Sequence, residues 1–365
     1  MKRRELVRNA GIAGILSVLP IAQFVMGQEQ KKLNVLFMGG TGFIGPHMVR
    51  AIAALGHNVT LFNRGKSNPD LFSELELIKG DRLSDDIRQV ANRRWDIIVD
   101  TSCYVPRAVN LLMDAVSHEH LQQYLFISTI SVYRDYSVPG ITESSPLQTM
   151  DDPTSEDVNT HYGALKVLCE QAAQAAVPGK LTIIRPGIII GPGDRSDRFT
   201  YWPETVYRGG EVLAPGKGDD AFQTLDARDL ANWVALCLRS QVMGTYNATN
   251  TAGTTNFRDV LESSRQELNP KATVTWVPHE FLLAQDLQEM GDLPFWVTPD
   301  GPYAGIFQVN SEAASGAGLR HRSLAESIRD THAWFQSQPE DRQKLRAGIS
   351  AEREAQVLAA WHKSQ

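Results

Sequence analysis

The sequence predicts an α/β fold in which a doubly wound parallel sheet precedes a smaller C-terminal α/β lobe. Apolar runs of strand length alternate with helical stretches in the first half of the chain, and a glycine-rich turn follows the first run. This alternation is typical of parallel sheets covered by helices on both faces. The chain has 365 residues, of which 42% are hydrophobic and 21% charged, so collagen, coiled-coil rods and wholesale disorder are excluded.

Three segments are expected along the chain. Residues 1–27 form a signal peptide, residues 28–190 a nucleotide-binding domain, and residues 191–365 a substrate-binding lobe. Within the last segment, residues 220–250 are expected to return to the nucleotide-binding domain. With only three cysteines, no disulfide framework is expected to organise the fold.

The first 27 residues differ from the rest of the chain in charge and hydropathy. Four basic residues and one acidic residue precede residues 10–27, which carry no charge. These are the features of an export signal, and the pair Arg3-Arg4 makes it similar to a twin-arginine signal. We therefore expect a periplasmic protein that is exported already folded; an uncleaved anchor or a frayed basic terminus is the alternative. Cleavage after Gly27 would leave 338 residues with a net charge of −9 rather than −6.

A glycine-rich turn stands between two strand-like segments. The apolar run Leu33–Met38 is followed by Gly39–Gly45, by a helical stretch and by a second apolar run, Val59–Phe62. In such a unit, one glycine makes the tight turn, one lets a pyrophosphate approach the backbone, and one lets helix and strand pack closely. The helix N-terminus then faces the phosphates, so the segment predicts a Rossmann-type dinucleotide site. The expected contacts here are Gly39, Gly42, Phe43, Ile44 and Gly45.

The residues after the second strand bear on which cofactor binds. Asn63 and Arg64 stand where an acidic residue would accept from the adenosine ribose and select NAD. A guanidinium instead suits a 2′-phosphate, so we expect NAD(P), leaning to NADP; a surface arginine in a turn is the alternative. Asp81 follows the strand expected at Leu75–Ile78 and is expected to contact the adenine, a role compatible with capping a helix.

Tyr162 and Lys166 are four residues apart in a helical stretch and therefore share one helix face. A phenol with a pKa of about 10 is a poor base at neutral pH, but a nearby ammonium and a positive nicotinamide ring favour the phenolate. An apolar strand, Tyr124–Ile127, ends in Ser128–Tyr133, whose hydroxyls could hold a substrate oxygen beside the phenol. Together these residues predict proton transfer coupled to hydride transfer.

On these residues, the chain resembles an extended or atypical short-chain dehydrogenase/reductase of the NAD-dependent epimerase/dehydratase group. The resemblance places the active-site tyrosine on Tyr162, the lysine on Lys166 and the serine or threonine on Thr129. It implies that Tyr162 is the acid/base, that Lys166 activates it and holds the nicotinamide ribose, and that Thr129 positions the substrate oxygen. The implied substrate is a secondary alcohol or ketone of a sugar-like compound.

Three departures separate the chain from relatives that use sugar nucleotides. Arg134 follows Val132-Tyr133 where those relatives commonly have glycine, residues 185–187 replace Arg-Tyr-Phe-Asn, and residues 100–104 replace Asn-or-His-x-Ala-Gly. The cofactor half therefore matches the family better than the substrate half, which weakens the expectation of a UDP-sugar epimerase.

Candidate substrate contacts come mainly from the expected lobe, where Asp194–Trp202 mixes arginines with aromatic residues. Arg195 and Arg198 could clamp an anionic or polyhydroxyl substrate, and Trp202 could stack on a sugar ring. Alternatively, this segment is a helix whose aromatic side chains pack inward. Ser131, beside Thr129 in the hydroxyl-rich segment, is a further candidate for a substrate contact.

Helix starts are also expected in the second half of the chain. Asp226 is expected to cap a helix that runs to Leu238, and Thr254-Thr255 to cap the next one. Two more helices are expected at residues 323–336 and 350–362.

The sequence is compatible with two classes of function. The first is an NAD(P)-dependent enzyme acting by hydride transfer. Because an exported protein would carry its cofactor with it, redox-neutral epimerisation is favoured over a simple NADP-dependent dehydrogenase or reductase of a non-sugar carbonyl compound. The rival is a non-catalytic RNA-binding protein of the same fold, as found among chloroplast relatives, and the net charge of −9 argues against it.

The expected partners are a small-molecule substrate and the twin-arginine export machinery. A homodimer and a monomer are both compatible with the sequence. No nucleic acid, no stable membrane insertion after signal removal and no metal ion are expected. The segment His118–His120 is not a usual zinc arrangement and has no cysteine or third histidine nearby.

Overall fold

The computed structural model describes residues 32–365, of which Leu33–Gln365 form one compact unit. The predicted export signal, residues 1–27, lies outside the described residues. No helix in the described part of the chain is long and apolar enough to cross a membrane.

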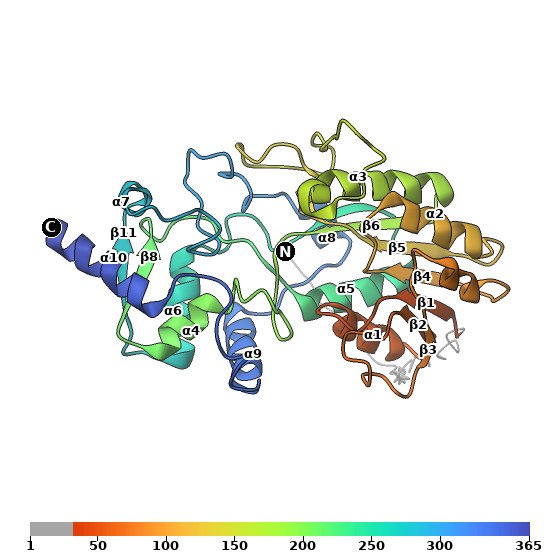
Figure 1. Ribbon diagram of the computed structural model, residues 1–365, viewed down its shortest axis with the longest axis horizontal. Coiled ribbons are helices and arrows are strands. Elements are labelled where there is room, and N and C mark those ends of the chain that lie inside the picture. Colours follow the sequence, from red (N-terminus) through yellow and green to blue (C-terminus); the bar gives the residue numbers. More distant parts are fainter. Residues whose placement is uncertain (1–31) are drawn as a thin grey trace, which may run out of the picture. The chain divides into compact units, whose positions relative to one another are not determined.

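A parallel sheet of seven strands organises the first part of the chain (Figure 1). Its order is β10-β6-β5-β4-β1-β2-β3, so the chain winds outward in both directions from β1 and β4. Buried strands of this kind are rich in apolar residues throughout, because helices cover both faces. The strands are β1 (Asn34–Met38), β2 (Asn58–Asn63), β3 (Glu76–Lys79), β4 (Ile97–Asp100), β5 (Gln123–Ile127), β6 (Leu181–Pro186) and β10 (Gly244–Ala248).

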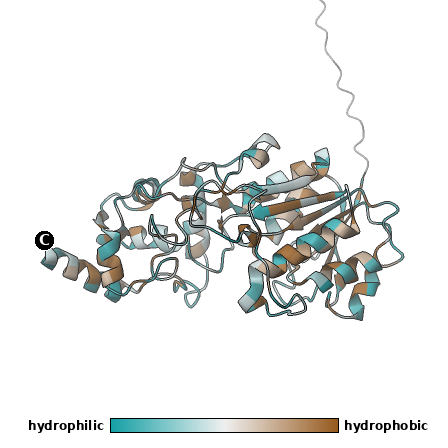
Figure 2. Ribbon diagram, turned by 90° about the horizontal axis from the view of Figure 1, so that it is seen from above, coloured by the Kyte–Doolittle hydropathy of each residue, from teal (hydrophilic) through white to brown (hydrophobic). Residues whose placement is uncertain are grey.

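Helices cover the two faces of this sheet, and the side-chain period of a strand decides which residue meets which layer. Leu36 and Met38 of β1 pack with α2 and α3, whereas Val35 and Phe37 pack with α1 and α5. Figure 2 shows the strands as hydrophobic and parts of the covering helices as hydrophilic. The predicted doubly wound α/β fold is therefore confirmed. The helices are α1 (Gly45–Ala53), α2 (Pro106–Ala115), α3 (Val158–Ala176) and α5 (Ala227–Ser240), with the short 3₁₀ helices η1 (Asp85–Val90) and η2 (Ile130–Val132) between them.

The smaller lobe has its own apolar core, built around Trp202, Phe222, Phe257 and Trp296. Two parallel strands lie against its helices, and two short paired strands, β7 (Ile189–Ile190) and β9 (Leu225–Asp226), stand where the chain leaves and re-enters the main sheet region. The remaining elements are α4 (Tyr201–Arg208), β8 (Glu211–Pro215), α6 (Phe257–Leu268), β11 (Thr273–Val277), α7 (His279–Ala284), α8 (Glu312–Gly316), α9 (Leu324–Gln336) and α10 (Ala351–Ser364).

Helix caps agree with the sequence in one case and differ in two. The Asp226 carboxylate accepts from the Arg228 amide and caps α5, as predicted. Ser323 caps α9, in the region where a helix was expected. Asn256, and not Thr254-Thr255, caps α6, because Asn256 and Asp259 exchange hydrogen bonds in a capping box. Asp81 caps no helix; Ser84 caps η1 instead.

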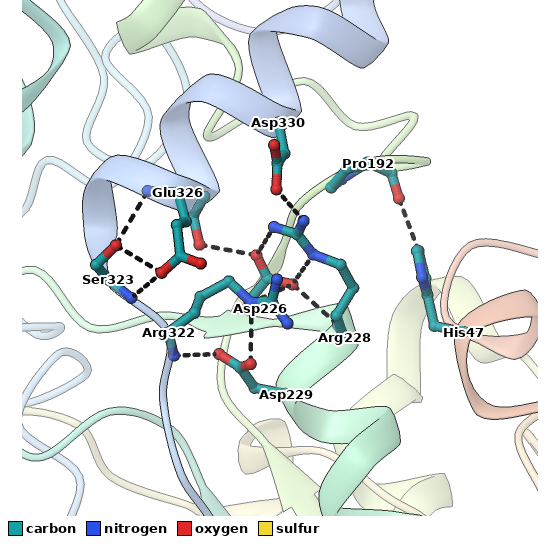
Figure 3. A network of polar contacts seen from close by, with 10 residues as sticks. His47, Pro192, Asp226, Arg228, Asp229, Arg322, Ser323, Glu326 and Asp330 are labelled. Atoms are coloured by element: carbon teal, nitrogen blue, oxygen red, sulfur yellow. Dashed lines mark hydrogen bonds and ion pairs between the residues drawn. The ribbon is translucent and has the colours of Figure 1, made fainter. Parts of the chain in front are cut away.

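A polar network joins α5 to α9, as the close view in Figure 3 shows. Asp226 accepts from Arg228 and from the Ser327 hydroxyl at 2.7 Å, while Arg228 also bonds Asp330. Asp229 accepts from the backbone and the guanidinium of Arg322, each at 2.9 Å. Since α9 also packs on α6 and α4, this network connects the sheet to the smaller lobe.

Candidate active site

The glycine turn Gly39–Gly45 connects β1 to α1, and its close packing requires glycine at two places. Gly39 has φ of 105°, in the left-handed region. A Cβ on Gly45 would lie 2.6 Å from a backbone atom of Gly40, so a side chain there would push the turn apart. A Cβ on Gly42 would meet nothing within 4 Å, because that position borders open space. The amides at the start of α1 have no side-chain cap, which leaves them available to an anion.

A cavity of about 560 Å³ lies over this turn. It is lined by all the residues predicted around the glycine turn and after the next two strands: Gly39, Gly42, Phe43, Ile44, Gly45, Asn63, Arg64 and Asp81. The open space at Gly42, the bare helix N-terminus and these polar side chains fit a dinucleotide.

Two asparagine side chains donate hydrogen bonds to backbone carbonyls of the glycine turn. Asn63 Nδ2 donates to the Gly39 carbonyl at 2.9 Å, and its Oδ1 accepts from the Gly65 amide at 2.8 Å. Asn68 Nδ2 donates to the Thr41 carbonyl at 2.8 Å. Asn63 is therefore a support of the turn, and Asn68 is a residue that sequence reasoning missed. Its signal is weak, because an asparagine in a polar loop is common.

Two cations stand free at the end of β2. Arg64 and Lys66 are exposed, line the cofactor cavity, and make no hydrogen bond or ion pair with any described residue. Asn63, and not an acidic residue, stands at the position from which a carboxylate would accept a hydrogen bond from a ribose hydroxyl.

A buried ion pair lies beside the same cavity, which Arg82 lines. Arg82 donates from two nitrogens to the two carboxylate oxygens of Asp100, each at 2.7 Å, and Tyr124 donates its hydroxyl to Asp100 at 2.9 Å. Burial would raise the pKa of Asp100, but Arg82 outweighs it and holds that pKa below its ordinary value. The Ser102 amide also donates to Asp100, so the pair fixes the loop after β4. A charged residue ending an otherwise apolar strand was the available signal for it.

Lys166 is locked between the ends of two strands. Its Nζ donates to the Ile127 carbonyl at 2.7 Å and to the Cys103 carbonyl at 2.9 Å, and lies 4.1 Å from the centre of the Phe126 ring. Burial lowers the pKa of Lys166 below its ordinary value. An ammonium has three N–H groups, so one remains for a ligand in the adjoining cavity that Lys166 lines.

Tyr162 lies one helical turn before Lys166 and is 37% exposed. The backbone of His161 is non-helical (φ −120°, ψ 26°), so the regular part of α3 starts at Tyr162. Burial raises the pKa of the Tyr162 phenol, and a hydrogen bond with the Thr129 hydroxyl acts in the opposite direction. The phenol is therefore protonated at neutral pH in this state.

The hydroxyl-bearing segment is held against α3. The Thr129 hydroxyl accepts from the Ser131 amide and donates to the Ser131 hydroxyl, both at 3.1 Å. A Cβ on Gly163 would lie 2.1 Å from the Ser131 carbonyl, so only glycine lets this segment approach the helix. Gln148 Nε2 donates to the carbonyls of Ser131 and Tyr133, which ties the segment in place. Gln148 is a second supporting residue that sequence reasoning missed.

Thr129, Ser131, Tyr162 and Lys166 line a second cavity, of about 430 Å³. It shares five lining residues with the cofactor cavity, so the two adjoin; these are Phe43, Ile44, Thr101, Tyr104 and Ile189. The predicted catalytic residues line the second cavity near this border: the Tyr162 ring centre lies 6.4 Å, and the Lys166 Nζ 5.9 Å, from the ring centre of Tyr104.

The predicted lobe contacts divide into two groups. Arg198 lines the second cavity, but Arg195 is exposed and lies outside its lining. Trp202 is fully buried and donates its Nε1–H to the Pro294 carbonyl at 2.9 Å within the lobe core. Trp202 therefore packs inward, as in the alternative of a core helix, and is not available to stack on a substrate. The clamp by Arg195 stays a prediction.

The cysteines and histidines singled out by the sequence take structural places. Cys103 is buried, with its sulfur 3.7 Å from that of Cys169. His118 Nε2 lies 3.0 Å from the Met113 carbonyl. Within residues 32–365, no group of three or more His, Cys, Asp or Glu side chains is arranged to hold a metal ion.

A parallel sheet with a glycine turn between its first strand and helix defines a dinucleotide-binding α/β protein. Comparison with known proteins narrows this class: residues 35–250 match the model of the NAD dependent epimerase/dehydratase family, and the chain belongs to that family.

Individual relatives are distant. The chain is 26% identical over 225 residues to the chloroplast stem-loop binding protein of 41 kDa b of Arabidopsis thaliana, covering 58% of this chain and 56% of that protein. It is 29% identical over 208 residues to the 3 beta-hydroxysteroid dehydrogenase/Delta 5-->4-isomerase of Mycobacterium tuberculosis, covering 50% and 54%. The chain thus spans little more than half the length of these two relatives.

Solved structures share the fold. The UDP-glucuronic acid 4-epimerase of Bacillus cereus, in complex with NAD, aligns with a TM-score of 0.62 at 15% identity, covering 87% of this chain and 99% of that one. The UDP-N-acetylglucosamine 4-epimerase of the same organism aligns with a TM-score of 0.59 at 18% identity, covering 85% and 98%. At these identities, the likeness shows the fold alone.

Proposed function

We propose that the protein is an NAD(P)-dependent oxidoreductase or epimerase that acts on a secondary alcohol or ketone of a sugar-like compound. The observation that carries the proposal is that Thr129, Tyr162 and Lys166 line one cavity together, and that this cavity adjoins the one over the glycine turn. A site for a dinucleotide and a proton-transferring side chain therefore adjoin each other.

The chemistry divides between cofactor and protein. A bound nicotinamide would accept or supply the hydride. Tyr162 exchanges a proton between its phenol oxygen and the substrate oxygen, and the protonated phenol of the unliganded site is ready to donate to a ketone. The Thr129 hydroxyl, which lines the same cavity, holds the same substrate oxygen. Lys166, fixed by two carbonyls, keeps a positive charge on this side of the site and offers its third N–H to a ribose hydroxyl.

NADP is the proposed preference. Arg64 and Lys66 are free cations beside the ribose position, and a guanidinium binds a phosphate through two parallel hydrogen bonds. Asn63 offers no charge, and both ends of its amide already support the glycine turn.

A redox-neutral cycle with a tightly held cofactor, and export by the twin-arginine route to the periplasm, extend the proposal. Both rest on the composition of residues 1–27. An enzyme without a supply of fresh cofactor needs a reaction that regenerates its own, and epimerisation through a ketone does so. A simple NADP-dependent reductase is the alternative, and it would release its cofactor after each turnover.

The test is the nucleotide content of the purified protein, followed by turnover. Mass spectrometry of the denatured protein should find NADP or NAD at near one equivalent. At least one sugar of a panel should then transfer hydride to the bound nucleotide, and this transfer should be lost when Tyr162 is replaced by phenylalanine. An empty protein with weak affinity for both nucleotides would contradict the closed cycle.

A non-catalytic RNA-binding role is a second candidate, favoured by the similarity to the chloroplast stem-loop binding protein. The net charge of −6 opposes it, since nucleic-acid binders concentrate positive charge. Tight binding of an RNA stem-loop that survives Tyr162→Phe, with no turnover of any sugar, would support this role over catalysis.

A further inference from the structure

The turn after β7 presents alternate residues to two different places. Three residues of the turn line the second cavity, which we call the substrate cavity: Asp194, Ser196 and Arg198. Arg195 is exposed outside this cavity, and Asp197 is fully buried and does not line it. A single short segment therefore supplies every polar side chain that the smaller lobe contributes to this cavity.

The turn is built rigidly by the C-terminal part of the chain. Asp197 has φ of 59°, a left-handed conformation that costs a non-glycine residue energy and persists only where contacts enforce it. Arg342 donates from both terminal nitrogens to the Asp197 carboxylate, at 2.6 and 2.9 Å, and to the Asp194 carbonyl at 3.3 Å. The Arg346 amide also donates to Asp197. Arg342 lies outside residues 35–250, so this clamp belongs to the part of the chain that the family model does not match.

The side chains of the turn offer both acceptors and donors. The buried Asp194 carboxylate accepts from the amide and the hydroxyl of Ser196, at 2.8 and 2.9 Å, and each of its oxygens has a further lone pair. Arg198 Nε donates to the Ser196 hydroxyl at 3.3 Å, while its terminal nitrogens bond no described residue. A hydroxyl group both donates and accepts, so neighbouring hydroxyls of a ring match this set.

The charges of the cavity do not suit a diphosphate. Of the four charged residues of the turn, Asp194 and Arg198 line the cavity, and their formal charges are opposite. Burial raises the pKa of Asp194, and the Arg198 charge acts against that rise. The other cation of the lining is Lys166, whose Nζ already serves two carbonyls. Lys166, Arg198 and Asp194 give the lining a net formal charge of only +1, so the two negative charges of a diphosphate would not be neutralised there.

The remaining wall is apolar. Ile188, Met290, Ile306 and Tyr136 line the cavity, and Met290 is held there in a left-handed conformation (φ 60°). Such a surface suits the C–H face of a ring, and a thioether adapts to its shape.

We infer that the Asp194–Arg198 turn is the specificity determinant of the site and that it binds an uncharged cyclic polyol directly, a free sugar or simple glycoside without a nucleotide diphosphate. This inference rests on the proposed function for the reaction, and on the turn alone for the substrate class.

Binding to the cofactor-loaded protein tests the substrate class without requiring turnover. Glucose, galactose, N-acetylglucosamine and methyl α-glucopyranoside would be compared with UDP and UDP-glucose by calorimetry and saturation-transfer NMR. We expect at least one free sugar to bind, and Arg198→Met to weaken it about tenfold, because hydrogen bonds from a charged group are lost. Arg195→Met is the matched control on the same turn and should change the affinity less than twofold.

Two results would overturn the inference: tighter binding of UDP or UDP-glucose than of every free sugar, with that binding lost in Arg198→Met, or no binding of any of the four sugars. Arg342→Met is a second variant, which should weaken sugar binding while nucleotide affinity stays unchanged.

The proposed function fails separately from the substrate class. Sugar binding through Arg198 without any hydride exchange with the bound cofactor would contradict the enzyme activity and leave the turn as a sugar site. Tyr162-dependent turnover of UDP-glucose alone would do the reverse.

Discussion

The cofactor cavity and the substrate cavity adjoin each other, but the chain builds them differently. Apart from Ile189, the cofactor cavity is lined by residues between Met38 and Tyr104, and four of them are glycines of the turn after β1. The substrate cavity takes residues from Phe43 to Ile306, and its polar turn depends on Arg342. The first is a local motif that many sequences repeat, whereas the second is assembled from distant side chains.

The largest expected effect lies where the two cavities join. Tyr162→Phe removes the proton-transferring hydroxyl, and the rate of turnover should fall about a thousandfold, since positioned acid–base groups contribute about 10²–10⁴-fold. Nucleotide affinity, measured by fluorescence titration, should stay within about twofold. Tyr207→Phe, an exposed phenol on α4, is the matched control. Equal losses in both variants would remove Tyr162 from the chemistry.

The lobe should fail on its own when its core is emptied. Trp202→Ala leaves a cavity and an unpaired Pro294 carbonyl, and should cost about 3–5 kcal/mol of unfolding free energy. Below the unfolding transition, nucleotide affinity should be unchanged, because Trp202 touches no part of the cofactor cavity. Denaturant unfolding followed beside nucleotide titration makes the measurement. A parallel loss of nucleotide affinity would show that the two regions are coupled more closely than their linings indicate.

A substitution at Arg64 tests the cofactor cavity without changing the lining of the substrate cavity. Arg64→Ala should reduce the preference for NADP over NAD by about tenfold, a value kept low because Arg64 is exposed to solvent. Dissociation constants for the two nucleotides provide the measurement, and Arg88→Ala, an exposed residue outside the cavity, is the control. An equal change for both nucleotides would argue against contact with a 2′-phosphate.

The smallest effect is expected at the network that joins α5 to α9. Burial would raise the pKa of Asp226, but hydrogen bonds from Arg228 and Ser327 hold it below its ordinary value. Its stabilising contribution is therefore complete above the ordinary aspartate pKa of about 4 and is lost as pH falls through the lower folded-state pKa. Asp226→Asn should cost about 1 kcal/mol at pH 7, since asparagine still caps a helix, and this cost should shrink below pH 4.

Unfolding of wild type and Asp226→Asn at several pH values measures this dependence. Asp70→Asn, in an exposed loop, serves as the control. A difference that grows on acidification would contradict the assigned direction.

The sequence was informative where backbone geometry makes the site. The glycine turn, the strands around it and the spacing of Tyr162 and Lys166 follow local rules, so the fold and the place of the cofactor cavity could be predicted. Asn68 and Gln148 could not, because their role depends on carbonyls that lie far away along the chain. These partners become visible only when the chain is folded.

The lobe shows the converse case. A segment that mixes arginines with aromatic residues is compatible with a binding site and with a core helix. The full burial of Trp202 shows that this residue belongs to the core. Arg195 and Arg198 are alike in sequence, and only the left-handed turn at Asp197 separates them. The clamp by Arg342, 145 positions after Asp197, has no local signal.

That clamp has a consequence for the order in which the protein matures. A ribosome adds about 5–20 residues per second, and the last strand of the main sheet, β10, ends at Ala248. Residues 249–341 must still be made before Arg342 can reach Asp197, which takes roughly 5–20 s at that speed. During this interval, every strand of the main sheet and every lining residue of the cofactor cavity has been made, whereas the residue that fixes the substrate turn has not. Synthesis therefore completes the residues of the nucleotide site before those of the substrate turn.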